Sequence, residues 1–137
     1  MIRRKPTIRR RRGVSAVEGA VVYPVAILLL MGMILIGMGI FRYEQVQSLA
    51  REGARYASVH GPAYSGATGN PMATAGDVQT YLATMAVGLS GLTCTAVDYS
   101  ASSLPCTVTV SLSYTWNPGT FFSSMTWNLS STMAVTY

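Results

Sequence analysis

Residues 19–41 read GAVVYPVAILLLMGMILIGMGIF and contain no charged side chain. Glu18 precedes this run and Arg42 follows it, so the uncharged stretch is 23 residues long. At about 1.5 Å per residue it forms a helix of about 35 Å, which is enough to cross a hydrocarbon core of about 30 Å with some tilt. A cleaved secretory signal has a shorter apolar region and then a small-residue cleavage site. We therefore predict a retained transmembrane helix.

Positive charge is concentrated on the N-terminal side of this run. Seven of the ten Lys and Arg residues lie in the first twelve positions: Arg3, Arg4, Lys5, Arg9, Arg10, Arg11 and Arg12. The remaining chain has three basic and five acidic residues, a net charge of −2. A basic arm can bind nucleic acid, but this one abuts an apolar run directly, and such charge holds its flank in the cytoplasm. We predict a cytoplasmic arm, an exported C-terminal part and no nucleic-acid partner.

A helical pattern continues past the apolar run, in FRYEQVQSLAREGARYASV at 41–59. Small residues at helical spacing form one face that another surface can approach closely: Ala50, Gly53, Ala54 and Ala57. That surface is either the protein's own domain or a neighbouring subunit, and both remain open. Gly61-Pro62 is expected to end the helix.

The segment 61–137 is predicted to be a small extracytoplasmic domain. Turn formers occupy 61–76, and Thr74 and Asp77 have the spacing of a capping box. One face of a following helix is marked by apolar residues at helical spacing: Val78, Tyr81, Leu82, Met85, Ala86 and Leu89. After Gly91 the period changes to two, with a strand over 107–116, a turn at 117–119 and strand-like pieces near 121–129 and 132–137. The predicted class is α+β: a long N-terminal transmembrane helix extending outside the membrane, then one helix and an antiparallel sheet.

Cys94 and Cys106 are the only cysteines. In an exported domain two cysteines favour a disulfide, which we predict here. Reduced structural thiols are the alternative, and a metal site would need ligands that the chain lacks.

Catalytic residues are not expected. From position 60 onward, the outer domain has one histidine, His60, and two acids, Asp77 and Asp98. We assign Asp77 to a helix start, and His60 beside Gly61-Pro62 fits a solvated helix end, where a cation suits the helix dipole. A nucleophile signature and a phosphate-binding glycine loop are both missing from the sequence, so we predict neither an enzyme nor a cofactor.

Residues 9–18, RRRRGVSAVE, place a glycine and then a glutamate between a basic leader and the apolar helix. This arrangement resembles the type III signal of type IV pilins and pseudopilins, which a prepilin peptidase cuts after the glycine. Together with Pro24 and AREGARYASV at 50–59, it resembles the TadE-like minor pseudopilins of the tight-adherence (Flp pilus) system. The resemblance covers about residues 9–60, with a looser likeness in the C-terminal strands. It departs at Val14, where many pilins carry Phe, and at Gly19, where a bulky apolar residue is more usual.

The resemblance implies a cut between Gly13 and Val14, which removes the seven leader charges and makes Glu18 the fifth residue of the mature chain. Glu18 would then neutralise the N-terminal amine of a neighbouring subunit, so that a buried acid gains its partner only on assembly. The resemblance also implies an assembly role for Pro24, and it includes a helix motif formed by Arg51, Glu52, Gly53, Ala54 and Arg55.

Three regions follow from this interpretation: a leader over 1–13, a transmembrane and amphipathic helix over 14–60, and a pilin-like domain over 61–137. The implied location is the bacterial inner membrane. The implied partners are the membrane, the prepilin peptidase and other pilins or pseudopilins of the Tad machinery.

Two functional hypotheses are compatible with this sequence. The first is a processed minor pseudopilin that supports assembly of a pilus or secretion filament, and it predicts loss of the first 13 residues. The second is an unprocessed, membrane-anchored extracytoplasmic binding domain, and it predicts an intact N-terminus.

Overall fold

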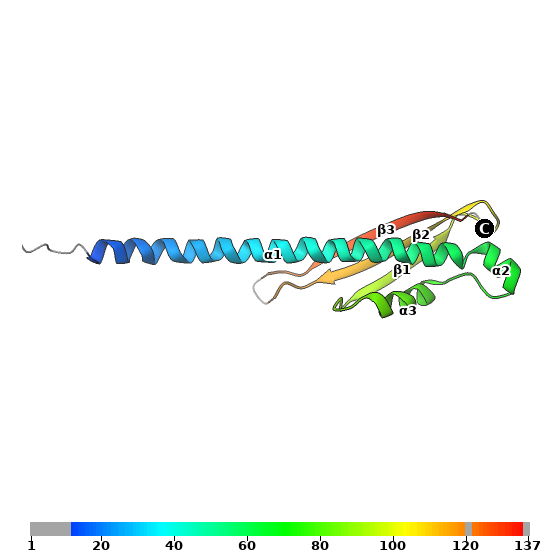
Figure 1. Ribbon diagram of the computed structural model, residues 1–137, viewed down its shortest axis with the longest axis horizontal. Helices are drawn as coiled ribbons and strands as arrows, with labels where there is room; N and C mark the ends of the chain where they lie inside the picture. The colour runs from blue at the N-terminus through cyan, green and yellow to red at the C-terminus, as the bar shows by residue number, and fades with distance from the viewer. Residues whose placement is uncertain (1–11, 120–121, 136–137) are drawn as a thin grey trace, which may run out of the picture. The chain divides into compact units, whose positions relative to one another are not determined.

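The computed structural model describes residues 12–119 and 122–135. Most of the predicted leader, residues 1–11, therefore lies outside the described part, as do residues 120, 121, 136 and 137. The elements follow in the order α1 (Arg12–Val59), α2 (Pro62–Thr68), α3 (Ala75–Met85), β1 (Leu92–Tyr99), β2 (Cys106–Trp116) and β3 (Met125–Val135) (Figure 1). The chain divides into two compact units, one ending at Gly37 and the other running from Met38 to Tyr137.

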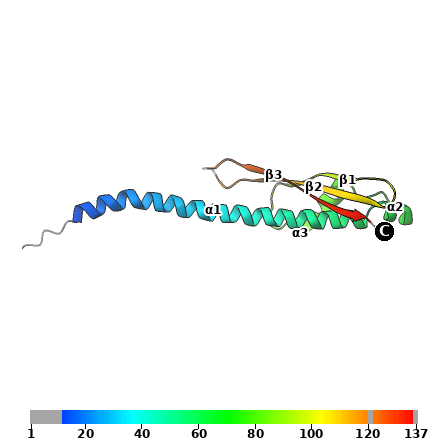
Figure 2. The same cartoon turned by 90° about the horizontal axis from the view of Figure 1, so that it is seen from above.

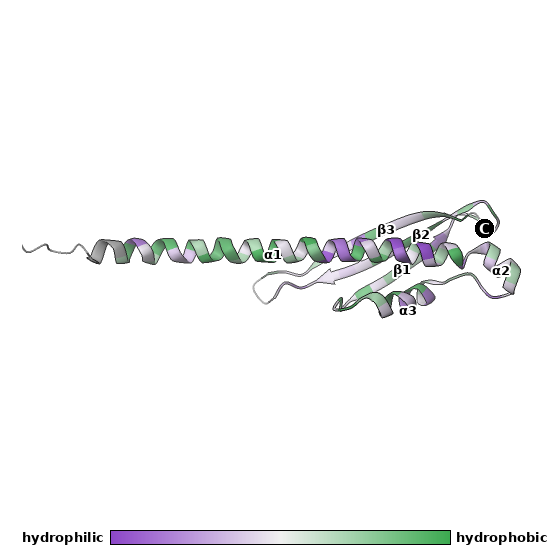
Figure 3. Cartoon of the chain, in the orientation of Figure 1, coloured by the Kyte–Doolittle hydropathy of each residue, from purple (hydrophilic) through white to green (hydrophobic). Residues whose placement is uncertain are grey.

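The described part of the first unit is the N-terminal portion of α1, and from Ala16 onward most of its side chains are exposed. Apart from the half-buried Leu35, the large apolar residues there have exposed fractions of 55–73%, from Val17 through Ile36. A helix that is apolar on every side lacks the polar face that a helix at a protein surface normally exposes to water. Figure 3 shows this portion mostly green, with hydrophilic colour becoming frequent only further along α1. Within the described residues, one helix is long and apolar enough to cross a membrane, and it lies near the N-terminus.

The second unit has two layers, a sheet and a pair of helices. The sheet has the order β1-β2-β3 with both pairs antiparallel. Figures 1 and 2 show the C-terminal half of α1 and the whole of α3 along one face of it. The sheet, the helical pair and the α+β class agree with the class predicted from the sequence.

The core lies between these two layers. Strand β2 supplies Val108, Val110, Leu112 and Tyr114, all at most 4% exposed, and α3 supplies Val78 and Leu82. Helix α1 contributes mainly small residues: Val46, Ala50, Ala54 and Ala57. The compact unit thus contains the second half of α1 as well as residues 61–137.

The opposite face of the sheet is polar. Thr109 lies 2.9 Å from Thr132 between hydroxyl oxygens, and Thr115 lies 3.1 Å from Thr126. Such cross-strand pairs stabilise a sheet on its solvent side. The period-two pattern predicted for 107–116 is therefore confirmed.

The connections differ in part from the prediction. Helix α1 ends at Val59, as Gly61-Pro62 indicated, but residues 62–68 form the short helix α2. Proline at the first helical position needs no backbone donor, so it can start a helix as readily as it can end one. The capping box is present: Thr74 Oγ1 accepts from the Asp77 amide, and Asp77 accepts from the Thr74 amide at 2.8 Å.

Two predictions about the strands were incomplete. The pieces near 121–129 and 132–137 are one strand, β3, which pairs with β2 from Met125 to Val135. Strand β1 was not delimited from the sequence, and its pairing shifts by one residue between Cys94 and Ala96. An irregularity of that kind breaks the period-two pattern by which a strand is found.

Candidate functional site

The predicted cleavage position lies in the first turn of α1. Gly13 and Val14 follow Arg12, where the helix begins. Glu18 comes four residues after Val14, and its side chain is exposed. The flanking Val17 and Val21 are 68% and 67% exposed. From Ala16 to Phe41, Glu18 is therefore the one charged residue of a largely apolar helix.

Pro24 lies inside α1, and the helix continues through it. Gly19, one residue after the glutamate, is covered by the ring of Tyr23. A Cβ atom at position 19 would lie 2.9 Å from Tyr23 Cε2. The ring of Tyr23, from the next turn of the helix, therefore occupies the space that a side chain at position 19 would take.

The motif at 51–55 divides between solvent and core. Arg51 and Arg55 are exposed, whereas Gly53 and Ala54 are buried. A Cβ atom on Gly53 would lie 3.2 Å from Val78 Cγ1, 3.3 Å from Leu82 Cδ1 and 3.4 Å from Val110 Cγ1. The small-residue face of the helix is thus packed against the protein's own domain, which decides between the two alternatives left open by the sequence.

Glu52 joins α1 to α3. The Tyr81 hydroxyl donates a 3.1 Å hydrogen bond to Glu52 Oε1. The pKa of Tyr81 is raised, mainly by burial and secondly by this hydrogen bond. The ring of Tyr81 also stacks on Tyr56 with centroids 4.4 Å apart. The motif therefore fixes the domain to the helix by shape at Gly53 and by a polar contact at Glu52.

His60 was predicted to be solvated, and this prediction is wrong. It is half-buried and stacks on Tyr56 at 4.2 Å, with Tyr64 edge-on at 4.9 Å. Its Nδ1 atom lies 3.0 Å from the Tyr56 carbonyl oxygen, so Nδ1 is the protonated nitrogen, because a carbonyl can only accept. A shallow cavity of about 190 Å³ adjoins this stack and reaches Asp77.

Asp77 performs the helix-capping role assigned to it. Hydrogen bonds from the hydroxyl and then the amide of Thr74 lower the pKa of the Asp77 carboxyl, with a small contribution from His60. Both of these hydrogen bonds are accepted by Asp77 Oδ2. The carboxyl is therefore engaged in the cap.

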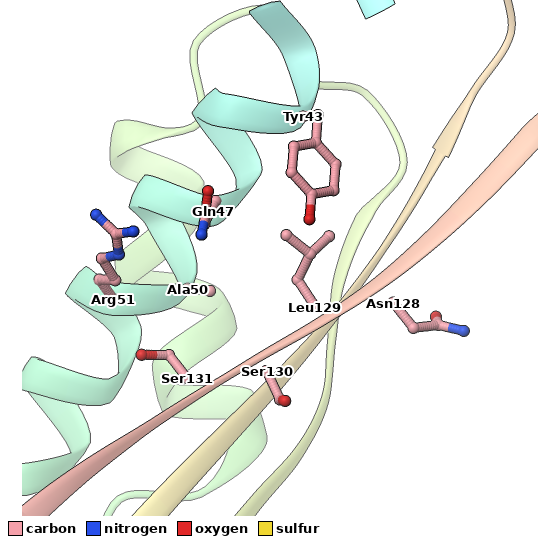
Figure 4. A pocket seen from close by; sticks show the side chains of 8 residues that line it. All are labelled: Tyr43, Gln47, Ala50, Arg51, Asn128, Leu129, Ser130 and Ser131. Carbon is pink, nitrogen blue, oxygen red and sulfur yellow. The ribbon is translucent and has the colours of Figure 1, made fainter. Parts of the chain in front are cut away.

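A second cavity, of about 240 Å³, lies between α1 and β3. Figure 4 shows Tyr43 and Leu129 pointing toward each other across it, while Asn128 and Ser130 point away. Ligand pockets usually enclose about 300–1,000 Å³, so this cleft is small for a metabolite. Its remaining lining residues are Gln47, Ala50, Arg51 and Ser131.

The predicted disulfide does not fit this fold. Both cysteines are free thiols, Cys94 half-buried and Cys106 buried. Cys94 pairs with Leu112 across the sheet, and Cys106 pairs with Val135. Leu112 is six residues along β2 from Cys106, about 20 Å at the rise of a strand, whereas bridged Cα atoms lie within about 7 Å. Among the described residues, His, Cys, Asp and Glu form no group of three able to hold a metal.

The family model described as TadE-like protein matches residues 13–55. This segment of the chain is TadE-like. The TadE-like segment contains the predicted cleavage position, Glu18, Pro24 and the motif at 51–55, and it ends within the part of α1 that packs on the domain. No curated protein and no solved structure matches the chain.

Several structural residues were not singled out from the sequence. Gln79 of α3 accepts from the Cys94 amide and donates to the Leu92 carbonyl at 3.0 Å, so it satisfies the free edge of β1. The Tyr99 hydroxyl donates to the Ala57 carbonyl at 2.9 Å, one of the carbonyls left unpaired at the end of α1. Both contacts join elements distant in sequence, and no local pattern marks them.

Proposed function

We propose that this chain is a minor pseudopilin-like membrane protein that supports assembly of a Tad/Flp-type pilus or secretion filament. The observation that carries the proposal is the TadE-like match over residues 13–55, which coincides with an exposed apolar helix bearing one acid near its start. A prepilin peptidase cuts between Gly13 and Val14, and the role is structural rather than catalytic.

The proposed topology follows from charge and exposure. The helix spans the inner membrane of a bacterium once, with the basic N-terminus in the cytoplasm. The domain is extracytoplasmic. Apolar side chains more than half exposed along α1, such as Leu28, Leu29 and Met33, support this because lipid would cover them.

Assembly uses Glu18. An ionised carboxylate at the membrane edge costs a few kcal/mol unless a cation lies beside it. Cleavage creates a new amino group at Val14, and in a filament the amino group of one subunit meets Glu18 of its neighbour. The other partners are then pilins or pseudopilins of the same machinery.

The proposal is tested with Glu18→Ala and Glu18→Gln in cells that make the complete machinery. Both variants should insert in the membrane like the wild type and fail to support filaments, because neither offers a carboxylate to the neighbouring amine. Glu44→Ala and Glu44→Gln, the same changes at an exposed acid of α1 beyond the uncharged run, are the controls for general effects of substitution. Normal filament assembly by both Glu18 variants would contradict the proposal.

The second hypothesis, an unprocessed membrane-anchored binding domain, is separated from the first by the N-terminus. In that case residues 1–13 persist and assembly is indifferent to Glu18. The TadE-like match favours the first hypothesis because it begins at the predicted cleavage position.

A further inference from the structure

Both tryptophans of the chain lie together at one end of the sheet. Trp116 ends β2, Trp127 lies near the start of β3, and their rings stack with centroids 5.7 Å apart. Tyr43 of α1 meets Trp127 edge-on at 5.8 Å, and Tyr114 lies 6.0 Å from it. We call Trp116, Trp127, Tyr43 and the neighbouring Phe122 and Met125 the aromatic end.

The aromatic end is level with the last turns of the uncharged run. A Cβ atom on Gly39 would lie 3.2 Å from Trp116 Cη2, and one on Gly53 would lie 3.4 Å from Val110 Cγ1. From Gly53 back to Gly39 the helix rises about 21 Å, and from Val110 on to Trp116 the strand advances about 20 Å. The two therefore run antiparallel in step, so Trp116 lies beside Gly39, two residues before the run ends at Phe41.

Exposed apolar side chains gather at this end of the second unit. Helix α1 exposes Met38, Ile40 and Phe41 by 48–61%, while Phe122 and Met125 are 53% and 54% exposed. Val87, in the connection from α3 to β1, is 81% exposed, and its neighbour Gly88 lies beside the Arg42 side chain, with 3.6 Å from an added Cβ to Nη1. Concentrated exposed apolar surface marks a contact with another molecule or with a membrane.

Strands β2 and β3 bring no charge to this region, because after Asp98 the chain has no Asp, Glu, Lys, Arg or His. Burial of the sheet part of the aromatic end in lipid therefore desolvates no ionised side chain. Arg42 and Glu44 of α1 flank this end, and the long side chain of Arg42 can keep its charged group at the hydrated headgroups. Trp and Tyr are the residues enriched at membrane–water interfaces, because their rings are apolar and their N–H and O–H groups stay hydrated.

We propose that the aromatic end inserts into the lipid headgroup region on the outer side of the membrane, as a second contact besides the spanning helix. This inference rests on the proposed function, because it requires residues 19–41 to lie in lipid. The contact holds the domain against the bilayer, whereas the β1–β2 connection, at the other end of the domain, faces away from it.

Intrinsic fluorescence tests this proposal directly, because both tryptophans belong to the aromatic end. The full-length protein is reconstituted into phosphatidylcholine vesicles, and flotation first establishes that it is membrane-embedded. Acyl chains brominated near the headgroup should then quench the emission more strongly than chains brominated near their ends. Trp116→Phe and Trp127→Phe show which ring contributes.

Substitutions then localise the contact. Phe122→Ser with Met125→Ser should remove most of the lipid quenching and increase quenching by aqueous acrylamide. Val59→Ser is the matched control, because Val59 is 64% exposed at the far end of the helix, and it should leave both signals unchanged. Near-UV circular dichroism checks that each variant is folded.

Three results would overturn the proposal in different ways. Protein that does not float removes the membrane span, and the proposed function fails with it. Floating protein without lipid quenching keeps the span and removes the interfacial contact. Acrylamide protection that disappears on diluting the protein in the bilayer, without lipid quenching, assigns the aromatic end to a second copy of the chain.

Discussion

The backbone of Gly53 in α1 lies directly against Val78 of α3, so that a Cβ atom on the glycine would lie 3.2 Å from Val78 Cγ1. This approach lets the TadE-like helix serve as one layer of the domain core. The same glycine faces Leu82 and Val110, so a side chain there meets the core from both layers.

Gly53→Val should therefore destabilise the domain. Overpacking a filled core typically costs about 1–3 kcal/mol, measured here by denaturant unfolding of the full-length protein in detergent, followed by near-UV circular dichroism. Gly66→Ala in α2 is the control, because nothing lies within 4 Å of an added Cβ there. Wild-type stability for Gly53→Val would mean that this face meets another subunit and not its own domain.

Gln79 holds the free edge of β1 through two hydrogen bonds to the backbone of Leu92 and Cys94. Gln79→Ala leaves an amide and a carbonyl of β1 without these partners, and the expected loss of unfolding free energy is about 1–3 kcal/mol. Gln47→Ala, at the rim of the cleft beside β3, serves as the matched substitution. Equal unfolding midpoints for the two variants would remove Gln79 from the structural account.

The Tyr99 hydroxyl should make the free energy of unfolding depend on pH in the alkaline range. Burial raises the pKa of its hydroxyl to about 12, from 10.0 in a model peptide. Since the folded-state pKa lies above the unfolded value, the stabilisation is fully present below pH 10 and is lost as the pH rises toward 12. Tyr99→Phe should be less stable than the wild type at pH 8, because it loses the bond to the Ala57 carbonyl.

The difference between the wild type and Tyr99→Phe should then shrink between pH 10 and 12. Unfolding free energies of both proteins across this range provide the measurement. A difference that is constant or widens with pH would show that the Tyr99 hydroxyl ionises at least as readily in the folded protein as in the unfolded chain.

The cysteines should remain reduced in the exported domain. Alkylation under denaturing conditions without a reductant should add two labels, at Cys94 and Cys106. In the native protein Cys94 should react first, because Cys106 is only 5% exposed. Burial raises the pKa of the Cys94 thiol, so its labelling should accelerate at higher pH. If labelling requires prior reduction, the two cysteines form a disulfide after all, and the strand register described above is wrong.

Some elements could be predicted because a local pattern determines them. The apolar run, the capping box from Thr74 to Asp77 and the alternation in β2 each depend on residues close in sequence. Strand β3 could not be delimited in this way. Ser130 and Ser131 are adjacent small polar residues that read as a break, and pairing with β2 carries the strand through them.

The disulfide prediction failed for a different reason, which is that sequence spacing does not determine strand register. Two cysteines twelve residues apart can flank a turn or lie at opposite ends of a hairpin, and only the register distinguishes these arrangements. The turn begins after Tyr99, so Cys106 lies next to it and Cys94 does not. His60 was misjudged for a related reason, since its stacking partner Tyr56 is in turn covered by Tyr81 from another helix.

Cleavage of the leader tests the central claim most directly. The measurement is the intact mass of the full-length protein, purified from membranes of cells that also make a prepilin peptidase, with Gly13→Leu as the variant that blocks the cut. We predict a wild-type mass that corresponds to a chain beginning at Val14 and an uncut mass for the variant. A wild-type mass that still includes residues 1–13 would contradict processing, and with it the role proposed for Glu18.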